Sequence, residues 1–257
     1  MAKEITFVAN ARASEGAAWV YHSWLMFRLH WPRYIGLTSL YLLLMQLTAT
    51  FTGPLVVLLN PVLSVGFLAA AWHHERGELP ELQHLFAGFR SNWRVLVALG
   101  GVQLLGLIVA LTVGLLASGL SFEQLKSIEE QGNVPPEALL RVMLVTLAIT
   151  LPVTAAMWFS PALVVFSDAS FAMAILASVR ATFANWLAMS VYGITMFALS
   201  VAAALLMAPL LYLLSPTTAL TLAMLLVVPL TAIRMISDYV CYRRVFHRGE
   251  VLEPRSA

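Results

Sequence analysis

Residues 95–116 read VLVALGGVQLLGLIVALTVGLL, a stretch without a single charged side chain. A helix rises about 1.5 Å per residue, so a segment of this length crosses the roughly 30 Å hydrocarbon core of a bilayer. Lipid offers no hydrogen-bond partners to the backbone, and the segment therefore has to be helical. This stretch predicts a membrane-spanning helix over about 93–119.

The composition of the whole chain agrees with membrane insertion. The 257 residues are 60% hydrophobic and only 11% charged, whereas soluble domains carry about 25% charged residues. The net charge of +2 gives no basic field of the kind that attracts nucleic acid, and we expect no nucleic-acid partner. The single cysteine, Cys241, excludes an internal disulfide and a thiolate zinc cluster.

Further apolar windows resemble the first one. They lie at about 34–52, 54–72, 137–166, 186–214 and 216–237. Gly53-Pro54 and Ser215-Pro216 are turn signals between neighbouring windows. We therefore predict an all-α fold, a polytopic membrane helix bundle with six transmembrane helices, as a single integral membrane domain over 1–257.

The basic residues are distributed unevenly between the two sides of this bundle. With the N-terminus in the cytoplasm, all of the 15 Lys and Arg residues except Lys126 and Arg141 fall on the cytoplasmic side. Basic residues are retained on that side during insertion. We therefore expect a multi-pass protein with its N- and C-termini in the cytoplasm.

Three segments next to the windows are too polar to cross a membrane, yet each carries an apolar stripe at helical spacing. The stripes are Val20, Trp24, Phe27 and Trp31; Leu82, Leu85, Phe86 and Phe89; and Phe171, Ile175, Val179 and Phe183. Such amphipathic helices lie in the membrane interface, where Trp is favoured at headgroup level. We predict three cytoplasmic interfacial helices, and the predicted interfacial anchors are Trp24, Trp31, Trp93 and Trp186.

The order of these features repeats along the chain. Each unit reads interfacial helix, Trp, outgoing span, and returning span with a proline, and the units cover about 17–74, 81–166 and 170–246. The prolines expected to kink the returning helices are Pro61, Pro161 and Pro229. We predict a threefold repeat of helical hairpins around an axis along the membrane normal.

Four stretches resemble a known family. They are WLMFRLHWP (24–32), HLFAGFRSNW (84–93), SPALVVF (160–166) and ASVRATFANW (177–186). They are similar to an uncharacterised family of bacterial inner-membrane proteins with about six spans, which is itself distantly similar to the membrane domain of some glycerophosphodiester phosphodiesterases. The resemblance implies a location in the bacterial inner (plasma) membrane and supplies no catalytic residues.

A few polar residues fall inside the predicted spans. Asn60 and Gln103 lie deepest, while Arg234 and Asp238 form an i, i+4 pair near the inner end of the last span. Ionisable groups at membrane depth indicate a functional site by default. Hydrogen bonds between helices and a local ion pair are the commoner roles of such groups. These residues would either line the path of a transporter or hold the helices together.

The remaining candidates lie near the cytoplasmic surface. His73 and His74 are the best metal ligands, but neighbouring side chains on a helix point about 100° apart, and we expect no metal or other cofactor. A basic cluster at the end of the last span is expected to face anionic lipid. Its members are Arg243, Arg244 and Arg248.

No nucleophile elbow, phosphate loop or metalloprotease motif is present, and we expect no enzymatic activity. The first interpretation is a non-enzymatic organiser of lipid or partner proteins at the cytoplasmic interface, with the phospholipid bilayer and a membrane protein as its expected partners. One alternative is a small transporter or channel. A second alternative is an intramembrane enzyme that acts on lipid.

Overall fold

The computed structural model describes residues 5–120 and 135–247, and within these ranges every regular element is helical. In chain order the elements are α1 (Ala13–Leu29), α2 (Trp31–Thr52), η1 (Gly53–Leu58), α3 (Asn60–Glu75), η2 (Leu82–Phe86), α4 (Ala87–Arg90), α5 (Trp93–Ser118), α7 (Pro136–Met157), α8 (Ser160–Phe166), α9 (Phe171–Ala184), α10 (Trp186–Leu213) and α11 (Pro216–Phe246). The predicted all-α, polytopic bundle is confirmed. Trp31, Trp93 and Trp186 are the first residues of α2, α5 and α10, as the sequence predicted.

Within the described ranges, five helical stretches are long and apolar enough to cross a membrane. They are Trp31–Leu58, Trp93–Ser118, Pro136–Phe166, Trp186–Pro209 and Leu222–Phe246. The window predicted over 54–72 is instead divided between η1 and α3, and α3 has only 16 residues. Pro54 and Pro61 explain the division, because each removes a backbone donor that a continuous helix would use.

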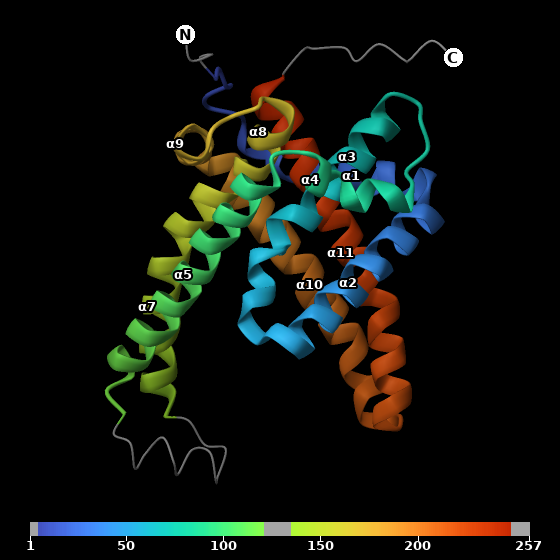
Figure 1. The fold of residues 1–257 in the computed structure, drawn as a ribbon. Helices are drawn as coiled ribbons and strands as arrows, with labels where there is room; N and C mark the ends of the chain where they lie inside the picture. Colours follow the sequence, from blue (N-terminus) through green and yellow to red (C-terminus); the bar gives the residue numbers. More distant parts are fainter. Residues whose placement is uncertain (1–4, 121–134, 248–257) are drawn as a thin grey trace.

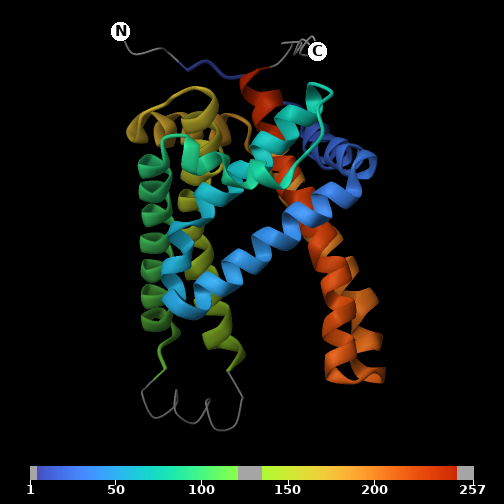
Figure 2. The same cartoon turned by 45° about the vertical axis from the view of Figure 1, so that its right-hand side comes forward.

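The long helices form two hairpins that lie side by side at one end of the molecule and separate toward the other (Figure 1, Figure 2). One hairpin is α5–α7 and the other is α10–α11, while α2 crosses obliquely between them. The two ends of the described chain meet at the end of the bundle where the hairpins lie side by side. There the Val8 N–H donates to the Val245 carbonyl at 2.7 Å. Both ends of the described residues thus share one side, and the assignment of that side to the cytoplasm stays a prediction.

The core is concentrated at this terminal end. Its largest fully buried side chains include Trp19, Tyr34, Phe67 and Tyr239. Farther from the termini, leucines of α5, α7 and α10 face outward, and hydrocarbon solvates them as well as a protein core would. The relation of the three predicted repeat units to one another stays a prediction, although a short helical segment precedes each of α2, α5 and α10.

The three predicted interfacial segments are built in different ways. In α1, Val20 and Phe27 are buried against the protein, so only part of the predicted stripe faces outward. The second segment consists of the 3-10 helix η2 and the single turn α4. In α9 the residues turned inward are small, and Phe171 and Phe183 are exposed.

The predicted proline kinks also take different forms. Pro61 and Pro161 lie in the first turns of α3 and α8, directly after breaks in the preceding helices. Only Pro229 lies inside a helix that continues, α11. The fixed φ angle of proline suits the first turn of a helix, where its missing N–H costs nothing.

Candidate functional site

A cavity of about 280 Å³ lies where α3, α5, α7, α8 and α11 meet. Its polar lining side chains are Asn60, Ser64, Gln103, Thr150, Thr154, Arg234 and Asp238. Leu68, Leu107 and Val153 are among the apolar ones. The structure therefore brings together all four intramembrane polar residues that the sequence singled out, although they come from three separate helices.

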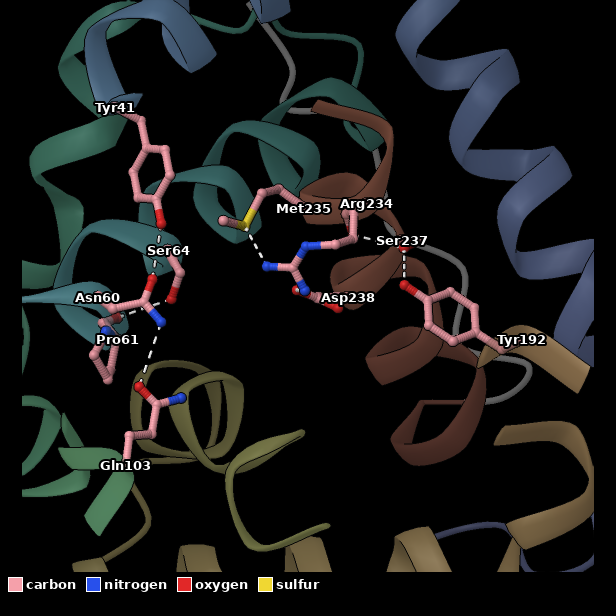
Figure 3. A network of polar contacts seen from close by, with 10 residues as sticks. All are labelled: Tyr41, Asn60, Pro61, Ser64, Gln103, Tyr192, Arg234, Met235, Ser237 and Asp238. Carbon is pink, nitrogen blue, oxygen red and sulfur yellow. Dashed lines mark hydrogen bonds and ion pairs between the residues drawn. The ribbon is translucent and has the colours of Figure 1, made fainter. Parts of the chain in front are cut away.

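The Asn60 side chain connects three helices at one wall of the cavity (Figure 3). The Tyr41 hydroxyl of α2 donates to Asn60 Oδ1 at 2.8 Å, and Asn60 Nδ2 donates to Gln103 Oε1 of α5 at 3.3 Å. Asn60 is the first residue of α3 because the chain breaks just before Pro61. Asn60 and Gln103 were expected either to hydrogen-bond between helices or to line a path; they are bonded to each other, and both line the cavity.

Arg234 and Asp238 form the predicted i, i+4 pair on α11, but the pair is loose. The Arg234 Nη1 to Asp238 Oδ2 distance is 3.8 Å, which is too long for a hydrogen bond. The Arg234 side chain is 50% exposed and that of Asp238 is 25% exposed. A guanidinium carries five donors and a carboxylate about four acceptor sites, so both groups keep hydrogen-bonding capacity toward the cavity.

A buried hydrogen bond ties α11 to α10 beside the charged pair. Tyr192 of α10 and Ser237 are bonded through their hydroxyl oxygens at 2.6 Å, and both residues are buried. In Figure 3 the Arg234 guanidinium extends away from this contact, in the direction of Ser64. The contact therefore sets the rotation of α11 that presents the charged pair to the cavity.

Sequence reasoning missed several lining residues. Ser64 lies four residues after Asn60, and Thr150 lies four residues before Thr154. Polar residues at this spacing within an apolar span share one helix face, and that signal would have found them. The contact between Tyr192 and Ser237, which lies outside the cavity lining, gave no such signal, because the two residues lie on different helices.

The predicted lipid-facing basic cluster is only partly correct. Arg243 is a correction: its side chain is only 11% exposed and contacts Glu75, with Nε 3.1 Å from Oε2 and Nη2 3.3 Å from Oε1. A carboxylate on α3 therefore holds this guanidinium between two helices and leaves little of it exposed. Arg244 is exposed, and Arg248 lies outside the described residues.

The four predicted Trp anchors are all exposed, and their anchoring role stays a prediction.

The histidines near the terminal end pair with neighbouring side chains. His73 contacts Glu78, and its ring stacks on that of His84 at 4.4 Å. His74 is hydrogen-bonded to the Tyr34 hydroxyl at 3.0 Å. Burial and, to a smaller extent, the charge of His30 lower the pKa of His74 to about 4. No group of three or more metal-ligating side chains occurs in the part of the chain that the structure describes.

No protein-family model and no solved structure matches the chain. A protein of Burkholderia thailandensis described as a probable inner membrane protein is 28% identical, over 95% of this chain and 95% of its own length. Among the described residues, the five long apolar helices agree with that description. The chain is therefore a polytopic helical membrane protein, similar over nearly its whole length to a protein described as a probable inner membrane protein.

Proposed function

We propose that this protein binds a small polar group in the cavity between its helices and moves it across or within the membrane, as a small transporter does. The observation that supports this function is the meeting of Asn60, Gln103, Arg234 and Asp238 at one cavity. The burial of ionisable groups at membrane depth costs free energy. Such groups are commonly retained along the paths of substrates or ions. Hydrogen bonds between helices do not explain the loose ion pair.

Two helix breaks at the cavity support the same proposal. The chain breaks before Asn60 in one returning segment and at Trp158-Phe159 in the next. Asn60, Trp158 and Pro161 all line the cavity. Pairs of proline-interrupted segments in corresponding positions are typical of transporter binding sites, where broken helices offer backbone groups to the substrate.

Cysteine accessibility tests the proposed function. In a Cys241→Ala background, Thr154→Cys places a thiol in the cavity, whereas Leu205→Cys places one on α10 at a position that is 68% exposed and outside the cavity lining. We expect an anionic, membrane-impermeant thiosulfonate to modify Thr154→Cys and to leave Leu205→Cys unmodified, because thiols in hydrocarbon do not ionise. Equal and negligible rates at both positions would refute a cavity that is reachable from water.

The charged pair supplies a second readout of the same experiment. Adding Arg234→Gln to the Thr154→Cys variant should lower the rate at which the anionic reagent modifies the thiol. The rate with a cationic reagent should stay the same or rise, because the cavity loses its positive charge.

The lining contains one carboxylate and neither His nor Cys. We therefore propose binding and movement at this cavity, without catalysis.

A second candidate is the organiser of lipid or partner proteins, which the exposed Trp24, Trp31, Trp93 and Trp186 favour. We propose that these side chains lie at the cytoplasmic interface of the bacterial inner membrane, with both termini on that side. We also propose that the chain is distantly similar to the membrane domain of some glycerophosphodiester phosphodiesterases. Cross-linking in membranes tests it: the capture of one defined protein, lost on Trp24→Ala and Trp186→Ala, supports an organiser, and unchanged capture contradicts it.

A further inference from the structure

The cavity contains one group of each charge. Among its lining residues, Arg234 is the only cation and Asp238 is the only anion. Some of the nearby neutral groups are already bonded within the protein: Asn60 and Gln103 bond to each other, and the Thr150 hydroxyl donates to the Thr146 carbonyl at 2.8 Å. The charged pair supplies the strongest hydrogen-bonding groups that the cavity offers to a ligand.

A ligand with a single charge fits this pair poorly. An anion bound to Arg234 would meet the carboxylate of Asp238, whose Oδ2 lies 3.8 Å from the guanidinium Nη1. A cation bound to Asp238 would meet Arg234 in the same way. Either ligand would also leave the site with a net charge at membrane depth, which is costly.

We infer that the cavity accepts a zwitterion, in which a phosphate or carboxylate and an ammonium group lie a few bonds apart; this inference rests on the proposed function. The anionic group of the ligand accepts hydrogen bonds from Arg234, and its ammonium group donates to Asp238. Each protein charge then gains the charge-assisted hydrogen bond that the 3.8 Å pair lacks. The site remains neutral overall, so binding brings no net charge into the membrane.

Two sources carry this chemistry: the headgroup of a zwitterionic phospholipid and a water-soluble zwitterion. The cavity, at about 280 Å³, is slightly smaller than most small-molecule sites, which begin at about 300 Å³. Apolar side chains of Leu68, Leu107 and Val153 line it beside the polar groups. Either a free headgroup or a headgroup whose acyl chains stay in the surrounding lipid meets these conditions.

Ligand binding to the purified protein in a non-ionic detergent tests the inference. The probes are dioctanoyl phosphatidylethanolamine, dioctanoyl phosphatidylglycerol, and the deacylated headgroups of both, with complexes counted by native mass spectrometry. We expect each ethanolamine probe to bind about tenfold more tightly than its glycerol counterpart, since a charge-assisted hydrogen bond is worth at least that ratio. Comparison of each lipid with its deacylated headgroup then identifies the source.

Variants of the pair make the inference sharper. Asp238→Asn leaves the cavity cationic and should reverse the preference toward the anionic glycerol probes, whereas Arg234→Gln should weaken all four probes. Arg141→Gln removes a charge from α7 outside the cavity and should change nothing. The double variant Arg234→Gln/Asp238→Asn keeps the net charge, and its melting temperature shows whether the fold survives loss of the pair.

The possible failures are distinguishable. A wild-type preference for phosphatidylglycerol, or a preference that Asp238→Asn leaves unchanged, overturns the zwitterion inference and leaves a binding cavity in place. The absence of specific binding for all four probes, together with an unreactive Thr154→Cys, overturns the proposed function as well.

Discussion

The Asn185 side chain holds the N-terminal segment against the bundle through hydrogen bonds. Its replacement by Ala should therefore destabilise the protein strongly. The side chain is 1% exposed and makes three hydrogen bonds. Its Oδ1 accepts from the Ala11 N–H at 2.8 Å, and its Nδ2 donates to the carbonyls of Val8 at 2.7 Å and Ala181 at 2.8 Å. Two of these bonds hold residues that precede α1 against the start of α10.

The size of the effect follows from these bonds. Each of the three lost hydrogen bonds is worth about 1 kcal/mol net, which makes about 3 kcal/mol together. We expect Asn185→Ala to lower the free energy of unfolding by about 3 kcal/mol. For a chain of this size, 1 kcal/mol corresponds to about 2–4 °C in melting temperature, so the expected decrease is about 6–12 °C.

Asn92→Ala is the matched control, because Asn92 also precedes the first Trp of a long helix but is exposed and makes no side-chain cap. Thermal unfolding in detergent should show a change within about 0.5 kcal/mol for this variant. Hydrogen exchange should show faster exchange at the Ala11 amide in Asn185→Ala alone. Equal and small effects of the two variants would refute the conclusion that the Asn185 hydrogen bonds hold the N-terminal segment in place.

Three further predictions concern packing, lipid contact and pH. Gly16→Val should lower stability by about 1–3 kcal/mol, because a Cβ at Gly16 would lie 2.1 Å from a backbone oxygen of α10; a melting temperature equal to the wild type would contradict this close approach. Arg244→Gln should weaken the dependence of melting temperature on anionic lipid, whereas Arg243→Gln should lower the melting temperature in every lipid, because its guanidinium is held by a carboxylate. The pKa of His74, at about 4, lies below its value of about 6.5 in an unfolded chain. The unfolded state therefore binds the proton first, and stability should fall as the pH drops from about 6.5 to 4, by about 1–2 kcal/mol after allowance for solvent screening; His74→Gln should flatten a plot of melting temperature against pH.

Hydropathy was sufficient to predict the long helices and the Trp residues at their starts. It failed over 54–72, because an apolar window does not record that Pro54 and Pro61 divide it into η1 and α3. Arg243 was predicted to face lipid since its partner Glu75 lies 168 residues away in the sequence. Contacts at such separations depend on how the helices pack, and no local pattern carries them.

The candidate site shows the same division. Asn60, Gln103, Arg234 and Asp238 were recognisable one by one, because polar groups are rare within apolar spans. Their meeting at one cavity depends on the break before α3 and on the rotation of α11, which the buried contact between Tyr192 and Ser237 fixes. The individual residues of the site could thus be predicted from the sequence, whereas their meeting at one cavity depends on how the helices pack.

The central claim is that the cavity holds a ligand in the membrane. A photo-cross-linking amino acid at Leu107, which lines the cavity, tests it most directly, with the same substitution at Leu205 on α10 as the control. After irradiation of native membranes and purification, mass spectrometry should find one defined adduct at position 107 that disappears when Arg234→Gln is added, and a mixture of bulk lipids at position 205. The same mixture at both positions, unaffected by Arg234→Gln, would contradict the claim.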